Sequence, residues 1–500
     1  MSTPHATNTD APGIRLHRSL TIVEYFAFGF GSMVGVGWLV LIDDWLARGG
    51  PLGAMLGFLA AGLLLLPVAY TYGRLVRTIQ DAGAEIAYTE GVFAPGIGFA
   101  AGWTMVLAYA IVCPWEAVAI GNLLARVFPA LNTHPLYIVA GKTIFAPRVA
   151  LGLLLTGLIT GVNLRGIRPS GVFQDATTFG LLAVFAVFAA LGLGRGSAAN
   201  LQPLFARPGA AGAWLSVLLM LQIVPYFMTG FESIAKGSEE ARADFDPRDF
   251  SRAMYAAVGV GAFFYIAIIG VVSFVFPWRE LVSNHLGTEV AFERAFGSRT
   301  IAQVIVFAAF LSLLKVFNGN FVAATRLLFG IGKRGLVHPS LARVHPAHGT
   351  PVNAILLVSA VTVAASLLGD AVLVPIAEVG SLAASVGWLS ASLAYLARER
   401  RPKVRRSEVR ESEVRRSAGG AGATRDTGRR RSLWPAWLAV AVSLAIILMK
   451  LLPPVPGSFT GNEWAALVLW SALGFGFWLA RKRSRDQDVG GHRGSPLQSR

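Results

Sequence analysis

Gly29-Phe30-Gly31-Ser32-Met33-Val34-Gly35-Val36-Gly37 lies inside the first apolar segment of the chain, which is long enough to cross a membrane. Each glycine inside a helix costs roughly 1 kcal/mol relative to alanine, so four at this spacing weaken the helix. In lipid an opened backbone is tolerated only where protein or a watery cavity surrounds it. The run therefore predicts a helix that is interrupted for a function. The alternative is close helix packing, because Gly31 and Gly35 form a GxxxG pair.

A second apolar segment contains the counterpart, Pro225-Tyr226-Phe227-Met228-Thr229-Gly230-Phe231-Glu232. Proline removes an amide donor and glycine loosens the backbone, and an ionisable residue follows at membrane depth. The two segments are the first and the sixth apolar windows, which are corresponding positions of two five-span halves. Interruptions at such positions predict a transporter site near the middle of the bilayer. Exposed amides would face a substrate carboxylate, and freed carbonyls would face its ammonium.

The composition indicates a membrane protein around these segments. Hydrophobic residues make up 54% of the 500 residues and charged residues only 14%, against roughly 25% in average soluble chains. So few charges cannot cover a soluble surface, and most of the chain must face lipid or other membrane-buried protein. The single cysteine, Cys113, excludes an internal disulfide and a cysteine-based zinc site.

Twelve windows reach the length of about 20 mostly apolar residues that crosses a bilayer as a helix. They fall near 22–46, 52–73, 96–124, 149–165, 172–194, 214–235, 253–276, 301–330, 352–369, 372–397, 434–453 and 463–480. The predicted fold is therefore an all-α integral membrane protein with twelve transmembrane helices. Residues 1–20 are polar and the first window is long, so no cleavable signal peptide is expected.

The net charge of +16 follows mainly from membrane topology. If the N-terminus is cytoplasmic, most of the 44 lysines and arginines fall in segments on the cytoplasmic side, as the positive-inside rule requires. This orientation depends chiefly on the basic segments 398–433 and 481–500. Contact with anionic membrane lipid is the further role expected of these charges, and nucleic-acid binding is not expected.

The windows and the polar segments divide the chain into five parts. We expect a cytoplasmic N-tail (1–20), a ten-helix core (21–397), a basic disordered linker (398–433), two last transmembrane helices (434–480) and a basic cytoplasmic tail (481–500). The composition of the linker is typical of a solvated, disordered segment. This ten-plus-two layout differs from the six-plus-six layout of the other common class of twelve-span transporters.

Four pieces, in this order and spacing, carry a resemblance to a known family. They are the glycine-rich first span; Gly50-Pro51-Leu52-Gly53 leading to Asp81-Ala82-Gly83-Ala84-Glu85-Ile86-Ala87-Tyr88; Gly230-Phe231-Glu232 followed by Ser238-Glu239-Glu240 and Asp246-Pro247-Arg248; and Thr325-Arg326 with Gly332-Lys333-Arg334-Gly335. Over roughly residues 18–400 the chain resembles permeases of the amino acid–polyamine–organocation superfamily. The resemblance implies a LeuT-like inverted repeat, with spans 1–5 against spans 6–10. It also implies secondary transport of amino acids or related amines.

The resemblance further implies roles for individual residues. The residues that resemble the loop binding the substrate's carboxylate are Ser32, Met33, Gly35, Val36 and Gly37. Tyr226 resembles a gating aromatic, Thr229 lies near the carbonyls that would bind the ammonium, and Asn318 and Asn320 resemble contributors to the side-chain pocket. Two features of relatives are missing: residues 171–194 contain no lysine, and Ala323-Ala324 stands where sodium-coupled relatives have a hydroxyl pair. Sodium coupling is therefore not expected.

Ionisable residues within the apolar windows need a partner or a role, because a charge at mid-bilayer costs about 2.5–3.5 kcal/mol. Glu232 either loads and releases a proton during transport, or is a structural carboxylate that is hydrogen-bonded to the first span or paired with Lys236. For Lys315 our hypothesis is that its ammonium supplies the charge that a sodium ion or a fifth-span lysine supplies in relatives. The alternative is a fixed ion pair with Glu116, Asp175 or Glu232.

Two further charged residues have competing interpretations. Glu116 either binds a cationic substrate tail or is a surface acid near the outer end of the third span. Arg326 is expected to snorkel to the interface or to bond to carbonyls, without touching substrate.

Other classes of function lack the residues they need. The eight histidines lie outside the apolar windows, and no His-Glu-x-x-His motif, P-loop or catalytic Cys–His pairing is present. We therefore expect no enzyme activity, no cofactor and no metal. The prediction is a permease of the cell membrane, with both termini cytoplasmic, that moves amino acids or related amines by alternating access and proton symport. The alternatives are an exchanger without proton coupling and a non-transporting amino acid sensor.

Overall fold

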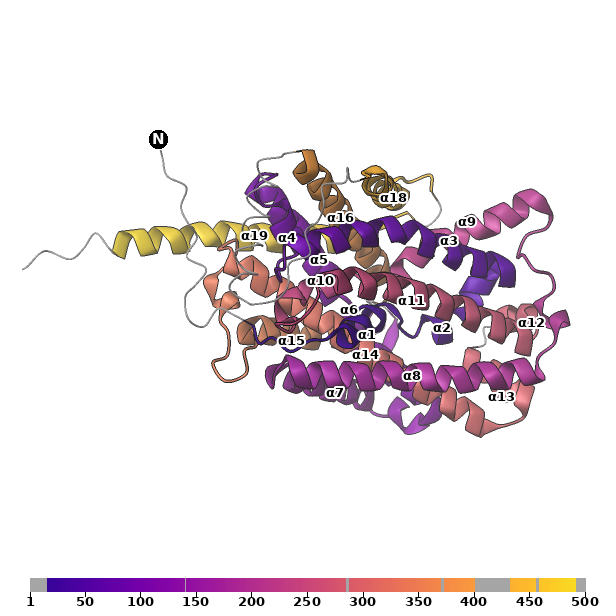
Figure 1. Ribbon diagram of the computed structural model, residues 1–500. Coiled ribbons are helices and arrows are strands. Elements are labelled where there is room, and N and C mark those ends of the chain that lie inside the picture. The colour runs from indigo at the N-terminus through magenta and orange to yellow at the C-terminus, as the bar shows by residue number, and fades with distance from the viewer. Residues whose placement is uncertain are drawn as a thin grey trace, which may run out of the picture.

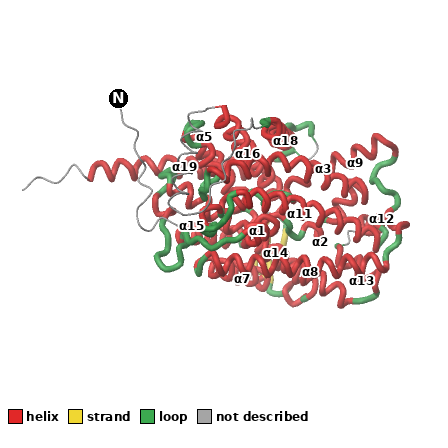
Figure 2. Tube along the Cα trace, viewed as in Figure 1, coloured by secondary structure: helices red, strands yellow, loops and turns green. Residues whose placement is uncertain are grey.

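The computed structural model describes residues 16–139, 141–284, 287–369, 373–400, 432–455 and 458–491. Within these ranges the chain is almost wholly helical, and most of the long helices run along one common direction (Figures 1 and 2). Figure 1 places α1 in the middle of the bundle, with α7 and α8 along one edge and α19 extending beyond one end. The interrupted segments thus lie inside the bundle, surrounded by other helices.

The helices occupy all twelve predicted windows. In chain order they are α1 (Ile22–Met33), α2 (Gly37–Val40), α3 (Ile42–Thr78), α4 (Glu85–Thr89), α5 (Pro95–Ala110), α6 (Val112–Val127), α7 (Ala146–Leu164), α8 (Ile167–Arg195), α9 (Gly209–Phe227), α10 (Ser233–Lys236), α11 (Arg248–Val275), α12 (Trp278–Ser283), α13 (Thr288–Phe296), α14 (Arg299–Lys333), α15 (Val352–Ser366), α16 (Leu373–Arg400), α18 (Trp434–Leu451) and α19 (Gly461–Gly491). Four 3-10 turns lie between them: η1 (Pro129–Asn132), η2 (Ala198–Leu201), η3 (Ser238–Glu240) and η4 (Pro339–Ala342).

Eight helices of the described residues are long and apolar enough to cross a membrane: α3, the joined α5 and α6, α7, α8, α11, α14, α16 and α18. Helix α1, the first part of α9, and α15 are apolar but shorter. The all-α, multi-pass fold is therefore confirmed, while the count of twelve crossings and the inverted repeat stay predictions. Of the predicted linker, residues 401–431 lie outside the described residues.

A small hairpin interrupts the helical pattern between α6 and α7. Strands β1 (Pro135–Val139) and β2 (Lys142–Phe145) pair antiparallel. The all-helical prediction did not include this hairpin.

The first interrupted segment begins and ends for local reasons. Thr21 caps the start of α1, and its amide donates to the carboxylate of Glu24 at 2.6 Å. Helix α1 ends at Met33, after which Val34 is extended (φ −88°, ψ 95°) and the chain re-enters a helix at Gly37. The glycine-rich run therefore breaks the helix, as predicted.

A sharp corner inside α3 joins the first span to the second. Gly50 has φ +65° and ψ 175°, a conformation that side-chain-bearing residues rarely adopt, and Pro51 follows it. The residues from Ile42 to Gly49 therefore continue the first span, whereas those after Pro51 form the second.

Candidate functional site

The two interruptions lie against each other at the centre of the bundle. Helix α9 ends at Phe227, α10 begins at Ser233, and Gly230 between them has φ +131°. A Cβ atom at Gly230 would lie 2.7 Å from the carbonyl carbon of Ser32 and 2.8 Å from the amide nitrogen of Met33. No residue larger than glycine fits there, so the backbones of the two interrupted segments are in direct contact.

The packing alternative for the GxxxG pair accounts for only one of its glycines. Gly31 packs tightly against the side chain of Gln174 in α8, whereas the nearest atoms to a Cβ at Gly35 would be Glu116 Oε1 at 3.7 Å and Val316 at 3.8 Å. Helix α1 also ends between the two glycines, at Met33. A continuous helix-packing face is therefore absent, and the position of Gly35 is in ordinary contact distance of α6 and α14.

Side chains of α14 and α11 donate hydrogen bonds to the carbonyls that the first interruption leaves without helical partners. Ser312 Oγ lies 3.0 Å from the Val34 oxygen and 2.9 Å from the Gly35 oxygen. The other donors are Asn320 Nδ2 to Ser32 O (3.2 Å), Tyr265 Oη to Met33 O (3.3 Å) and Lys315 Nζ to Gly31 O (3.5 Å) and Val34 O. The carbonyls of the interruption are thus satisfied by side chains of α11 and α14.

Lys315 is the cation at this interruption. Its side chain is fully buried, and Nζ lies 5.2 Å from the centre of the Phe30 ring as well as on the Gly31 and Val34 carbonyls. None of the ion pairs among the residues with described positions includes Lys315. The alternative of a fixed ion pair is therefore not found, and backbone carbonyls hold the ammonium.

The register of α14 separates the Ala323-Ala324 pair from the carbonyls of the first interruption. Ala323 of the Ala323-Ala324 pair lines a small cavity with Leu20 and Tyr25, about two turns from the carbonyls that Lys315 binds. The residues of α14 that face those carbonyls are Ser312 and Lys315. From the fifth span, Gln174 donates to Ala27 O at 3.2 Å, so α8 supplies a neutral amide to α1.

Glu232 lies at the second interruption. Its Oε2 accepts from the Gly230 amide at 3.1 Å, and its Oε1 has no hydrogen-bond partner among the described residues, although the side chain is fully buried. Lys236 does not pair with this carboxylate. It donates to the Glu232 carbonyl oxygen at 3.2 Å and forms its ion pair with Glu85 of α4, Nζ to Oε1, at 2.6 Å. Both structural alternatives for Glu232, bonding to the first span and pairing with Lys236, are therefore wrong.

A buried polar cluster that sequence reasoning missed surrounds Lys236. Tyr72 Oη donates to Glu85 Oε1 at 2.5 Å, and Lys236 Nζ lies 5.1 Å from the ring centres of both Tyr72 and Tyr109. The cluster joins α3, α4, α5 and α10. Glu85 lies in one of the sequence pieces that carry the family resemblance. The sequence signal that could have revealed the cluster is an acidic residue between two helices that carry tyrosines.

Asn318 and Asn320 point in different directions. Asn320 bonds to the first interruption. Asn318 Oδ1 accepts from Asn163 at 2.9 Å, and its Nδ2 donates to Gln174 Oε1 at 2.9 Å. Asn318 thus belongs to a buried amide network with α7 and α8, and the structure does not bring it to the interruption.

The remaining predicted residues lie around the contact between the interruptions. Ser32 Oγ is 3.4 Å from Ser233 Oγ, and the Met33 sulfur packs on Gly261 of α11. Gly37 packs on the Phe227 ring, where its Cβ would lie 2.8 Å from the ring. Thr229 stands inside the second interruption, and the Tyr226 ring would lie 3.6 Å from a Cβ at Gly380 of α16. Tyr226 therefore stands at the contact between α9 and α16, and its role as a gating aromatic stays a prediction.

Two sequence interpretations of charged residues are wrong because both side chains are buried. Glu116 is 3% exposed and lies in the bundle, so it is not a surface acid. Arg326 does not snorkel: it is fully buried and forms a two-pronged ion pair with Glu240, with Nη2 to Oε1 at 3.0 Å and Nε to Oε2 at 3.2 Å.

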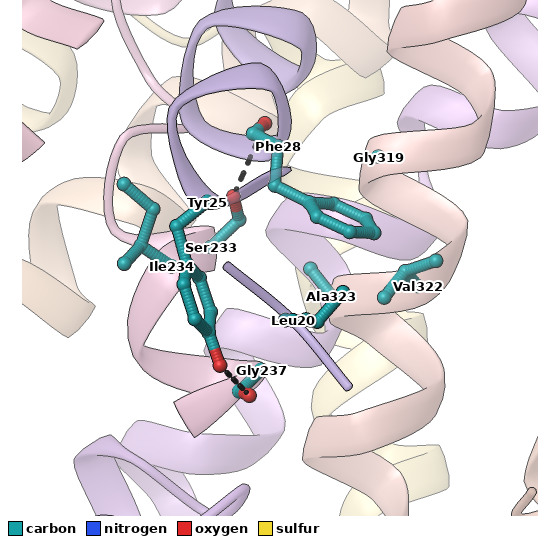
Figure 3. Close-up of a pocket in the computed structure, with 9 residues that line it drawn as sticks. All are labelled: Leu20, Tyr25, Phe28, Ser233, Ile234, Gly237, Gly319, Val322 and Ala323. Carbon is teal, nitrogen blue, oxygen red and sulfur yellow. Dashed lines mark hydrogen bonds between the residues drawn. The ribbon is translucent and has the colours of Figure 1, made fainter. Parts of the chain in front are cut away.

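On the side of the interruptions where Leu20 lies, hydrogen bonds join the half-helix α1 to the half-helix α10. Figure 3 shows the Tyr25 hydroxyl donating to the Gly237 carbonyl (2.6 Å) and Ser233 Oγ donating to the Phe28 carbonyl (3.5 Å). The cavity between them has a volume of about 10 Å³, room for about one water molecule. This conformation is therefore closed to a substrate from that side.

Charged loops reinforce this closed end. Arg334 makes two hydrogen bonds of 2.8 Å to the carboxylate of Asp81, and Lys333 Nζ lies 2.9 Å from Glu239 Oε1. Burial alone would raise the pKa of Asp81, but Arg334 and Lys333 lower it to about 2. The Ser19 and Leu20 amides both donate to Glu240 O. These contacts join the chain before α1 to the connections that follow α3, α10 and α14.

A bundle of apolar helices whose two interrupted members meet at its centre defines a multi-pass membrane protein of the transporter class. The chain belongs to the amino acid permease family, whose sequence pattern matches residues 20–473.

Individual relatives agree with this assignment. The chain is 22% identical to the amino-acid permease RocE of Bacillus subtilis, over 79% of this chain and 83% of the relative. It is 25% identical to the methylthioribose transporter of the same organism, over 78% and 83%. It is 27% identical to a probable GABA permease of Pseudomonas aeruginosa, over 70% of both chains. The predicted family is confirmed, and so is a multi-pass membrane protein that acts in amino acid transport.

Proposed function

We propose that the protein is a secondary active transporter that takes up amino acids or related amines across the cell membrane by alternating access, in symport with protons. The observation that carries the proposal is the position of Lys315, whose buried ammonium binds the Gly31 and Val34 carbonyls at the first interruption. The same family of proteins includes relatives whose names state amino acid permeation.

The backbone of the first interruption supports the binding of a zwitterion. In this proposal the substrate's carboxylate accepts from the amides of Gly35, Val36 and Gly37, of which Gly37 starts the next half-helix. The carbonyls of the second interruption, around Thr229, offer acceptors to its ammonium. Ser32, Met33 and Asn320 hold the backbone of the first interruption in the shape that this requires.

Lys315 and Glu232 are the groups that we propose for proton coupling. A protonated lysine donates to carbonyls as an ammonium, with a full charge, whereas a neutral amine holds them less strongly. Loss of the proton would therefore release the Gly31 and Val34 carbonyls and free α1 to move. Glu232 has an unpartnered Oε1 beside the second interruption, so it offers a place for a proton on the neighbouring half-helix.

The orientation in the membrane is part of the proposal. We infer that the N-terminus, the connections bearing Asp81, Glu240 and Arg334, and the C-terminal tail lie in the cytoplasm. Support comes from the basic segments 398–433 and 481–500, which would satisfy the positive-inside rule there. The end closed by the Tyr25 and Asp81 contacts would then be the cytoplasmic end.

Uptake into liposomes tests this function. Purified protein is reconstituted, radiolabelled amino acids are supplied outside, and the proton gradient is set by buffers of different pH. Symport predicts accumulation above the outside concentration only when the outside is more acidic. Flux that requires a counter-substrate inside the liposomes would establish the exchanger, and binding without any flux would establish the sensor.

A further inference from the structure

Glu116 of α6 is a buried acid that the site described so far does not use. Its side chain is 3% exposed, and its Oε2 has no hydrogen-bond partner among the described residues. Its Oε1 would lie 3.7 Å from a Cβ at Gly35, in contact distance of the first interruption, and Val316 of α14 would lie 3.8 Å from the same Cβ. The carboxylate therefore lies against the part of the first interruption to which the proposed function assigns the substrate's carboxylate.

The neighbouring charged and polar groups leave this carboxylate short of a partner. Lys315 is the nearest cation, but its ammonium is held by the carbonyls of α1 and forms no ion pair with Glu116 among the described residues. The Tyr265 hydroxyl on the same side donates to Met33 O. A buried carboxylate without a hydrogen-bonded partner is costly, and a cation on the substrate would supply that partner.

The direction from which that cation would come follows from the contacts of the first interruption. The second interruption touches it at Ser32 and Met33, through Gly230. Glu116 borders the Gly35 side. A bound amino acid with its ammonium at the second interruption and its carboxylate at the Gly35 and Val36 amides would therefore extend its side chain toward α6 and α14.

We propose that Glu116 is a specificity-determining residue that binds the ammonium or guanidinium at the end of the substrate's side chain. The transported amino acid then carries a cationic side chain. This inference rests on the proposed function, because it names the substrate class of the same site. An ion pair with hydrogen bonds in a desolvated pocket would make the charged substrate bind better than an uncharged isostere.

Ligand binding to the purified protein tests the inference, with lysine compared with norleucine and arginine compared with citrulline. Each pair differs chiefly in the side-chain charge. The wild type is expected to bind lysine at least about tenfold more tightly than norleucine. In Glu116→Gln this ratio should fall below about threefold, because a neutral amide no longer favours a cation.

Two further variants keep the test decisive. Asp175→Asn removes a carboxylate of α8 whose charged neighbour is Glu24 of α1, and should keep the lysine preference of the wild type. Glu116→Asp keeps the charge with a shorter side chain, so it should bind lysine more weakly while still preferring it to norleucine. If Glu116→Gln does not fold, the preference for lysine over norleucine in the wild type and in Glu116→Asp still tests the inference.

The possible failures are distinguishable. A wild type that binds norleucine as tightly as lysine, or a Glu116→Gln protein that keeps the tenfold preference, overturns the cation site alone, because amino acids still bind. If neither amino acids nor amines bind or move, the proposed function falls and this inference falls with it.

Discussion

The backbone of Gly230 lies directly on the peptide that joins Ser32 to Met33, so that a single added Cβ atom would come within 2.7 Å of the Ser32 carbonyl carbon. Residues about 200 positions apart in the chain thus meet without any side chain between them. This contact sets the spacing of the two interrupted segments, and it can be tested by adding one methyl group.

Gly230→Ala should impair both stability and uptake. Alanine at φ +131° is strained. Its Cβ would also collide with the backbone of Ser32 and Met33, which cannot move away as a flexible side chain could. A lower midpoint of thermal unfolding and a loss of substrate uptake are expected. The matched control is Gly259→Ala in α11, where an added Cβ meets no atom within 4 Å. That variant should equal or exceed the wild type in thermal stability, because alanine favours a helix. Equal behaviour of the two variants would contradict the contact.

Lys315→Met should abolish the dependence of uptake on the proton gradient. Methionine fills a similar volume but cannot donate to the Gly31 and Val34 carbonyls. Uptake is measured in liposomes over outside pH values from about 5 to 8. Lys142→Met, on the exposed strand β2, serves as the control and should keep the wild-type profile. If Lys315→Met keeps a wild-type pH profile and merely gives less folded protein, the lysine is structural.

Breaking the buried pair of Glu85 and Lys236 should be strongly destabilising. Both side chains are fully buried and their charged atoms are 2.6 Å apart. Removal of one partner leaves a buried charge alone, at a cost of about 3–5 kcal/mol in the free energy of unfolding. Glu85→Gln and Lys236→Met should each lower thermal stability markedly, and the double variant should lose less than the sum of the two. Additive losses would show that the two residues act independently.

The exposed pair of Arg242 and Asp244 is the control for this experiment. Its side chains are 52% and 70% exposed, and pairs of this kind contribute about 0–1 kcal/mol. Asp244→Asn should therefore leave the melting midpoint nearly unchanged.

The Asp81–Arg334 contact should show a defined pH dependence. Burial raises the pKa of Asp81, but Arg334 and Lys333 outweigh burial and lower it from its ordinary 3.8 to about 2. A carboxyl with a lowered pKa in the folded state contributes stability above its ordinary pKa and loses it as pH falls through the folded value. The stability difference between the wild type and Asp81→Asn should thus be constant from about pH 7 to 5, and it should shrink below about pH 4. A difference that already falls between pH 7 and 5 would contradict the assigned shift.

The interruptions could be predicted from the sequence because their causes are local. Glycine and proline change backbone preferences at the residue itself, so the end of α1 at Met33 and the turn at Gly230 follow from the residues present. The helices could be placed for the same reason, since an apolar window of sufficient length needs no knowledge of its neighbours.

The orientation of side chains on α14 could not be predicted. Successive residues of a helix point about 100° apart, so Asn318 and Asn320 face nearly opposite sides. Only the packing of α14 against α1 and α8 decides which of them reaches the interruption, and Asn320 does. The same register places Lys315 opposite the Gly31 and Val34 carbonyls.

Ion pairs between residues that are distant in the sequence could not be predicted either. Arg326 binds Glu240, and Lys236 binds Glu85, in both cases across connections that hydropathy does not describe. The burial of Glu116 likewise depends on the depth of α6 within the bundle. The hairpin of Pro135–Val139 and Lys142–Phe145 did leave a signal, since its strands are rich in aromatic and β-branched residues.

The single cysteine makes the molecule convenient for spectroscopy. Cys113 is fully buried in the third span, so thiol-reactive probes should ignore it in the folded protein. Engineered cysteines at Leu20 and Ala241, which form an isolated bridge beside the closed end, would then carry spin or fluorescent labels without background. The distance between such labels would report, in real time and for each candidate substrate, how often the two half-helices part.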